Sequence, residues 1–106
     1  MLGSMVRMLI VYGSPSDPEA FDRHYREQHV AIARKLPHLH AYSLSEDVRG
    51  HDGQGRGERV ETFDFSDRRM LEEALASDDG KAMLADTESM AKDGLMMLTF
   101  EVKDGR

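Results

Sequence analysis

The sequence contains no cysteine. Disulfide bonds, thiolate nucleophiles and cysteine-ligated zinc or iron–sulfur sites are therefore excluded for this chain. It also has no apolar run close to the ~20 residues that a membrane-spanning helix needs. Positive charge is scarce, since 14 Lys and Arg stand against 20 Asp and Glu, a formal net charge of −6 at pH 7. This deficit argues against nucleic acid or an anionic membrane as a partner, because clustered cations bind both.

The length and composition favour one folded domain. A chain of 106 residues has room for a single domain, and 40% hydrophobic residues are too many for a disordered one. Residues 1–4, which end in Gly-Ser, resemble a remnant of cloning, with Met5 as a second possible start. We therefore expect the domain over residues 5–106. A secretory signal has a basic segment followed by an apolar stretch, and the sequence shows no such pattern. The expected location is therefore the cytoplasm.

The first third of the chain predicts a strand followed by a long helix. Apolar and β-branched residues over Val6–Tyr12 predict the strand, which ends at a Gly-Ser-Pro turn. The S-x-x-E pattern from Ser16 to Glu19, with a proline inside it, predicts a capped helix start. Apolar residues then recur at helical spacing, which predicts one long helix that ends before Pro37.

The remaining elements follow from alternation, glycine-rich breaks and caps. They are a strand over Leu39–Val48, a flexible connection over 49–58, a strand over Val60–Phe65, a helix after the cap Ser66-Asp67 that breaks and restarts at 77–80, and a strand over Leu95–Val102. The resulting order βαββαβ is typical of an α+β, ferredoxin-like sandwich with both helices on one face of the sheet.

The other face of this predicted sheet lacks a cover. Both sides of the first strand are largely apolar, so the face away from the helices also needs to be buried. The chain encodes no third layer. A second copy of the chain is the simplest source of one, and we expect a symmetric homodimer.

Residues in both halves of the chain resemble a known family. The first helix carries Phe21-x3-Tyr25-x3-His29, followed by Leu36-Pro37 and then Tyr42; the second half carries Ser77-Asp78-Asp79-Gly80-Lys81, Asp86 and Gly94-Leu95-Met96-Met97-Leu98. These segments resemble the EthD family, which is named for a cluster concerned with degrading ethyl tert-butyl ether. The resemblance implies a dimeric α+β barrel and, in the wider group, monooxygenase, isomerase or dehydratase activity. His38 stands where the family usually has glycine.

Histidines and tyrosines are the candidate site residues. Phe21, Tyr25 and His29 are four residues apart and form one stripe on the helix. His29 can exchange a proton near neutral pH, and burial favours its neutral form as a base. Alternatively, it only hydrogen-bonds a backbone carbonyl and fastens the helix to the sheet. His40 and Tyr42 share one face of the second strand, so His40 is the other candidate base.

The predicted site thus contains two candidate bases and a set of substrate contacts. His29 or His40 would take the proton, and the substrate-binding residues would be Tyr12, Tyr25, Tyr42 and Phe63. We expect no metal, because His38-x-His40 lacks a third ligand and because His24 and His29, five apart, do not share a face of an α-helix. Asp86 is expected to anchor a loop. No nucleotide, flavin or haem signature is present, so no cofactor is expected.

Two functions from different classes remain open. The first is a cofactor-independent enzyme, an oxidoreductase of the monooxygenase type or an isomerase or dehydratase. It would act on a small hydrophobic, aromatic or polyketide-like molecule through proton abstraction beside a carbonyl or phenol. The second is a non-catalytic binding or accessory protein that uses the same cavity. A cavity histidine bonded to another polar side chain favours the enzyme, and a purely apolar void favours binding. A barrel filled with side chains would indicate an assembly domain.

Overall fold

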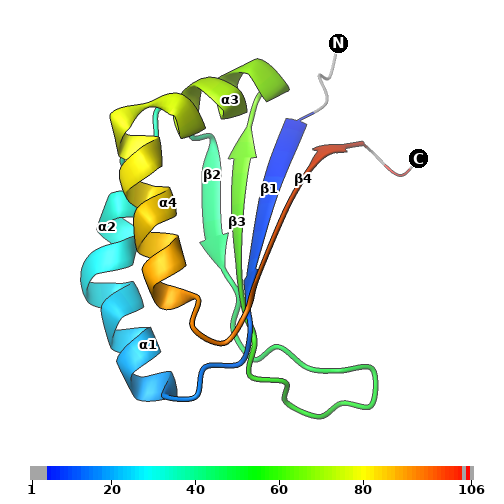
Figure 1. The fold of residues 1–106 in the computed structure, drawn as a ribbon. Coiled ribbons are helices and arrows are strands. Elements are labelled where there is room, and N and C mark those ends of the chain that lie inside the picture. Colours follow the sequence, from blue (N-terminus) through cyan, green and yellow to red (C-terminus); the bar gives the residue numbers. More distant parts are fainter. Residues whose placement is uncertain (1–4, 104, 106) are drawn as a thin grey trace.

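The computed structural model describes residues 5–103 and 105 of the chain. The predicted cloning remnant at 1–4 lies outside the described residues. Figure 1 shows the elements in chain order. They are β1 (Met5–Tyr12), α1 (Pro18–His24), the π-helical turn η1 (Tyr25–His29), α2 (Val30–Ala33), β2 (Ala41–Leu44), β3 (Arg59–Phe65), α3 (Arg68–Ala76), α4 (Asp78–Met90) and β4 (Leu95–Val102).

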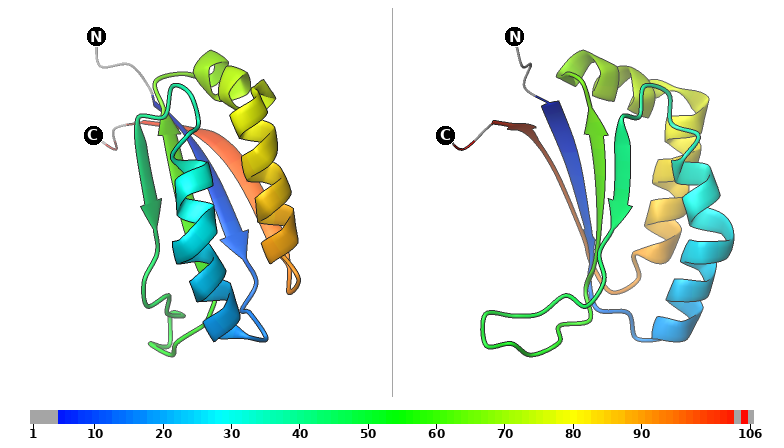
Figure 2. Two further views of the ribbon diagram at one scale, coloured as in Figure 1. Left: turned by 90° about the vertical axis from the view of Figure 1, so that its left-hand side faces the viewer. Right: turned by 180° about the vertical axis from the view of Figure 1, so that it is seen from behind.

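The strands form one antiparallel sheet in the order β2-β3-β1-β4. The helices lie together on one face of this sheet, and no helix of residues 5–103 covers the opposite face (Figures 1 and 2). This arrangement is the α+β, ferredoxin-like fold that the element order predicts. Among the described residues, no helix is both long and apolar enough to cross a membrane.

Alternation along β1 decides which side chains face the helices. Its even-numbered residues are at most 2% exposed, whereas its odd-numbered residues are only partly buried. The strand register pairs Ile10 with Glu61 of β3 and Leu9 with Leu98 of β4. Because paired residues point to the same side of a sheet, Glu61 faces the helices and Leu98 lies on the open face.

The edge strand β4 is exposed from Leu95 to Glu101. Met97 pairs with the fully buried Ile10 and so points toward the helical side, yet it is 38% exposed. The helices therefore leave this strand largely uncovered, although Arg68 of α3 donates to Thr99 at 3.1 Å. The large apolar side chains left exposed on it are Leu95, Met96, Met97, Leu98 and Phe100.

The first helix differs from the predicted regular helix in two respects. Its N-cap is Asp17, whose side chain accepts a hydrogen bond from the backbone of Ala20 at 3.1 Å. The expected cap, Ser16, instead bonds to Asp93, because Pro18 occupies the first helical position and leaves Asp17 as the cap. The helix also contains the π-turn η1, in which hydrogen bonds join residues five apart.

The second helical segment agrees with its prediction. Asp67 caps α3 by accepting from the backbone of Met70 at 2.9 Å, and Ser77 caps α4 by accepting from Gly80 at 3.0 Å. The break at 77–80 is thus a true restart of the chain into a new helix. On α4, the side chains of Met83 and Thr87 are fully buried.

The second strand is shorter than predicted. It spans only Ala41–Leu44, because as an edge strand it pairs with β3 alone and the chain leaves the sheet after Ser45 donates to Val60. The segment 46–58 then projects away from the body on the side of the sheet opposite the helices (Figure 2). Its own structure is a small turn with a bridge between Arg49 and Gly55.

Candidate active site

A buried carboxylate lies between the sheet and the helices. Glu61 of β3 is 0% exposed. It accepts hydrogen bonds from the hydroxyl of Tyr12 at 2.7 Å and from the hydroxyl of Tyr42 at 2.5 Å. Nε2 of His29 lies 3.0 Å from Oε2 of Glu61, the oxygen that also accepts from Tyr42. These donors offset the cost of removing a charged carboxylate from water, and hydrogen bonds to a charged group are the stronger kind.

His29 lies between two carboxylates. Its Nε2 faces Glu61, and its Nδ1 lies 2.6 Å from Oδ2 of Asp86. Burial lowers the pKa of His29, but the hydrogen bonds and charges of Glu61 and Asp86 raise it by more than burial lowers it. The net pKa of His29 therefore lies above its ordinary value of 6.5. With an acceptor at each nitrogen, the ring is placed to donate on both sides as an imidazolium.

A second histidine reaches the same aspartate. Nε2 of His24 lies 2.8 Å from Oδ1 of Asp86, so one carboxylate of α4 holds two side chains of the first helix. The expectation that His24 and His29 cannot share a face is wrong. The π-turn between them has a wider i→i+5 repeat, which brings residues five apart onto one side.

Two tyrosines extend the chain of hydrogen bonds from Glu61 to the first helix. The hydroxyls of Tyr25 and Tyr42 are 2.6 Å apart. Because Tyr42 donates its proton to Glu61, Tyr25 is the donor to Tyr42. Burial raises the pKa of Tyr25 to about 12, and burial together with the charge of Glu61 raises the pKa of Tyr42 further. Both therefore keep their protons at neutral pH.

We call this connected set the Glu61 cluster. Thr87 of α4 closes it at one side, where its Oγ1 lies 3.2 Å from the hydroxyl oxygen of Tyr12. Within the part of the chain that the structure describes, no buried side-chain nitrogen or oxygen lacks a hydrogen-bond partner. The members of the cluster are Glu61, His29, Asp86, His24, Tyr12, Tyr42 and Tyr25.

The cluster meets two cavities at its two ends. The large cavity, about 370 Å³, lies between the first helix, which contributes Tyr25, and the chain at the end of β2 and the start of β3. Its other lining residues are Asp22, Arg26, Ser45, Glu46, Asp47, Glu58 and Arg59. The small cavity, about 180 Å³, lies between α1 and the end of α4 and is lined by His24 and Phe21 among others.

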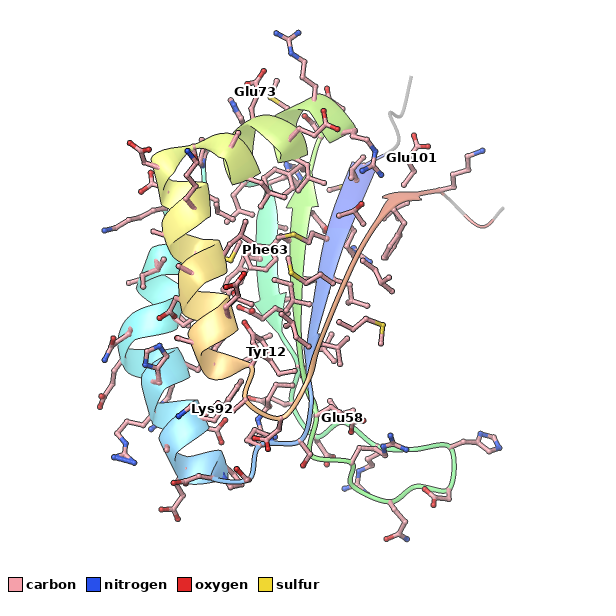
Figure 3. All side chains as sticks on the ribbon, in the orientation of Figure 1. Tyr12, Glu58, Phe63, Glu73, Lys92 and Glu101 are labelled. Atoms are coloured by element: carbon pink, nitrogen blue, oxygen red, sulfur yellow. The ribbon has the colours of Figure 1, made fainter. Side chains whose placement is uncertain are left out.

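The structure brings most of the predicted site residues together. His29, Tyr12, Tyr25 and Tyr42 all belong to the Glu61 cluster. Phe63 is fully buried and packs against the ring of Tyr42, with ring centroids 4.9 Å apart. Tyr12 and Phe63 are visible between the sheet and the helical layer in Figure 3.

His40 lies apart from these residues. It precedes β2, is exposed to solvent, and is fastened by its backbone, which donates to the carbonyl of Asp64 at 2.8 Å. Its side chain does not belong to the Glu61 cluster. His38 is exposed as well and contacts Glu73 at 3.1 Å. The backbone of His38 has φ of 64°, a left-handed conformation that favours glycine.

Sequence reasoning missed the residue at the centre. Glu61 follows the same alternation as Phe63 and Phe65, and an acidic residue at an inward position of an otherwise aromatic strand face signals a buried, partnered carboxylate. Asp86 is also more than the expected loop anchor. It lies within α4 and joins that helix to both histidines of the first helix.

Comparison with known proteins gives a consistent family. A model of the EthD domain matches residues 14–104. An EthD family protein from Bacillus halodurans is 28% identical with a TM-score of 0.86, and the match covers 93% of this chain and 99% of that one.

Two more distant structures share the fold. One is a dimeric ferredoxin-like protein of unknown function from Thermobifida fusca, with a TM-score of 0.70, 15% identity and coverage of 94% of this chain and 92% of its own. The other is SnoaB, a cofactor-independent oxygenase from Streptomyces nogalater, with a TM-score of 0.66, 14% identity and coverage of 94% of each chain.

Proposed function

The chain belongs to the EthD family, and from this premise and the geometry of the Glu61 cluster we propose that it is a cofactor-independent proton-transfer enzyme. Its substrate would be a small aromatic or polyketide-like molecule bound in the large cavity. The observation that carries the proposal is a fully buried carboxylate, Glu61, joined by hydrogen bonds of 2.5 and 2.6 Å through Tyr42 to Tyr25, which lines that cavity. The oxygenase activity of SnoaB is compatible with such a reaction.

The proposed step is removal of a proton from a phenol or from carbon beside a carbonyl. The oxygen of Tyr25 accepts the substrate proton while its own proton passes to Tyr42 and the proton of Tyr42 passes to Glu61. The substrate is left as a phenolate or enolate, and Glu61 becomes neutral. The high pKa of Tyr25, about 12, suits this role, because the hydroxyl hands on a proton without resting as a phenolate.

His29 has a supporting role in this proposal. Both of its ring nitrogens face carboxylates, so it has no free lone pair with which to contact a substrate directly. Its Nε2 lies 3.0 Å from Oε2 of Glu61, so it contacts the carboxylate that would accept the proton. His29 is thus the charge partner of the acceptor, and Tyr25 is the residue that contacts the substrate.

A binding protein is the second candidate. One observation favours it: every buried polar side-chain atom of the described residues has a partner, as in a network that only stabilises the fold. The large cavity is also lined by several charged residues, which would hold the oxygen-bearing groups of a ligand without reacting with it.

Turnover of a panel of phenolic and polyketide-like compounds separates these candidates. We expect Glu61→Gln to lower kcat by about 10²- to 10⁴-fold, the usual contribution of a general acid or base, with little change in ligand affinity. Tyr25→Phe removes the contact with substrate and leaves the buried carboxylate in place. His51→Gln, at an exposed position of the 46–58 segment, is the matched control. Binding without turnover by the unaltered protein would establish the binding function instead.

We also propose that two copies pack through the open sheet face. Apolar side chains of β4 are exposed on that face, with Met96 at 51% and Leu98 at 47%, because no second layer of the described residues covers them (Figure 2). The segment 46–58 projects toward the same side of the sheet (Figure 2). A symmetric dimer would bury both apolar faces at once.

A further inference from the structure

We propose that His24 is the proton port of the Glu61 cluster: it exchanges protons between Asp86 and water in the small cavity. A proton taken up at Tyr25 on one side of the first helix would then leave from His24 on the other side. The part that concerns a substrate rests on the proposed function. The exchange of protons between the buried cluster and water does not.

An unbroken hydrogen-bond path leads from the centre of the cluster to His24. Nε2 of His29 lies 3.0 Å from Glu61, Nδ1 of the same ring lies 2.6 Å from Asp86, and the second oxygen of Asp86 lies 2.8 Å from Nε2 of His24. Every contact is within hydrogen-bond distance. Protons can therefore pass between the inner and outer histidine without a gap to bridge.

Exposure rises along this path. The side chains of Glu61 and His29 are 0% exposed, that of Asp86 is 13% exposed and that of His24 is 29% exposed. His24 also lines the small cavity, whereas His29 does not. The path thus runs from the dry interior to a side chain that water reaches, and its outermost group is an imidazole, which exchanges protons near neutral pH.

The local backbone supports the same reading. A regular α-helix would put His24 and His29 on different faces, and the π-turn brings both onto Asp86. Such turns are rare and recur at functional sites. One histidine would be enough to join the helix to α4, so the second contact needs a reason other than packing.

The charges around His24 come from both elements that face it. Asp86 approaches from α4, and the small cavity is also lined by Asp17 near the helix start and by Lys92 and Asp93 after α4. Asp93 accepts from the backbone of Ser16, so its carboxylate is held at the opposite wall of the cavity.

The proton balance of the outward step is closed. Asp86 takes the Nδ1 proton of His29 and passes it to Nε2 of a neutral His24, and the resulting imidazolium releases its Nδ1 proton to water. No electrons are gained or lost. In this step His24 begins as its Nδ1–H tautomer and ends as its Nε2–H tautomer, and Glu61 and His29 are both left neutral. The starting state returns when Glu61 gives its proton back through Tyr42 and Tyr25 and a proton from water returns through His24 and Asp86 to Nδ1 of His29.

The test is the exchange of the His29 ring N–H protons with water, measured by NMR on protein labelled with ¹⁵N-histidine. His24→Gln retains an N–H donor for Asp86 but cannot shuttle a proton, and His51→Gln is the matched control. We expect exchange to slow by about 10²-fold in His24→Gln, the lower end of the usual contribution of a general acid or base, and to be unchanged in the control. Equal exchange in His24→Gln and the unaltered protein would overturn the proposal.

A second variant gives an independent answer. His24→Ala leaves space beside the small cavity, so added imidazole should restore the exchange rate in a concentration-dependent way. Exchange that is slow with and without imidazole would overturn the role of His24 as a port. Slowed exchange in a protein that turns over no member of the panel would contradict the proposed enzyme but uphold the port. Unchanged exchange in the His24 variants of a protein that turns over the panel would contradict the port but uphold the proposed enzyme.

Discussion

The hydroxyl of Tyr42 lies 2.5 Å from Oε2 of Glu61, although the two residues come from different strands. Tyr42 and Glu61 both point toward the helices, since Tyr42 pairs with Phe63 and Glu61 with Ile10. This contact places a buried charge within reach of a chain of hydroxyl groups, and the stability of the fold should depend on it.

Removing that hydroxyl should destabilise the protein. Tyr42→Phe takes one donor from the fully buried Glu61, and we expect the free energy of unfolding to fall by about 1–3 kcal/mol. Tyr25→Phe removes only the bond to Tyr42 and should cost about 1 kcal/mol or less. Urea unfolding of both variants measures the difference. Equal losses would show that Glu61 does not depend on the hydroxyl of Tyr42.

The raised pKa of His29 predicts a pH dependence of stability. Because the folded protein binds this proton more tightly than the unfolded chain does, the stabilisation is complete below about pH 6.5 and is lost as pH rises through the folded-state pKa. Urea unfolding at a series of pH values upward from 6 should show this decline. His29→Gln should remove this component and His51→Gln should keep it. A decline of the same size in His29→Gln would assign it to another group.

The open sheet face predicts a change of oligomeric state on substitution. Leu98→Lys places a charge in the middle of the exposed apolar strand and should convert a dimer into monomers. Ala82→Lys adds the same charge at an exposed position of α4 and should leave the dimer intact. Sedimentation at micromolar concentration distinguishes the two states. A monomeric unaltered protein would contradict the proposed dimer.

Gly80 tests the close packing of α3 against α4. Alanine is usually better than glycine inside a helix by about 1 kcal/mol. At this position, however, a Cβ atom would lie 2.1 Å from the carbonyl oxygen of Ala74 and 2.7 Å from Leu75, both backbone contacts. The clash should outweigh the propensity, so Gly80→Ala should lower the melting temperature.

The control for Gly80 lies two residues further on. Ala82→Gly, at an exposed position of the same helix, should cost about 1 kcal/mol from propensity alone. A rise in melting temperature for Gly80→Ala would mean that the two helices separate without cost.

Elements with a strong local signal could be predicted from the sequence. The last strand spans Leu95–Val102 as expected, because its apolar run is bounded by a glycine and charged residues. Asp67 caps α3 for a reason that lies within four residues of chain. The second strand was predicted too long, because its end depends on where β3 stops offering partners and not on its own residues.

The site could be predicted only in part. The spacing of Tyr25 and His29 marks them as neighbours on a helix, and alternation puts Tyr12 and Tyr42 on inward faces. Nothing in that pattern reveals that His29 lies between Glu61 and Asp86, since these are 32 and 57 residues away from it in sequence. His40 follows the same strand pattern as Tyr42, but it lies beyond the end of the strand, where the helices do not cover it.

The amino-acid sequence by itself determined the element order, the faces of the strands and the family, because each follows from short-range periodicity and local motifs. Only the tertiary structure decided the π-turn that brings His24 and His29 onto Asp86, the burial of Glu61, and the exposure of β4. The physical reason is that a helix of regular spacing would satisfy the same local pattern. The π-turn is instead favoured by the contacts of His24 and His29 with Asp86 of α4 and Glu61 of β3. These carboxylates come close only when the sheet and helices pack.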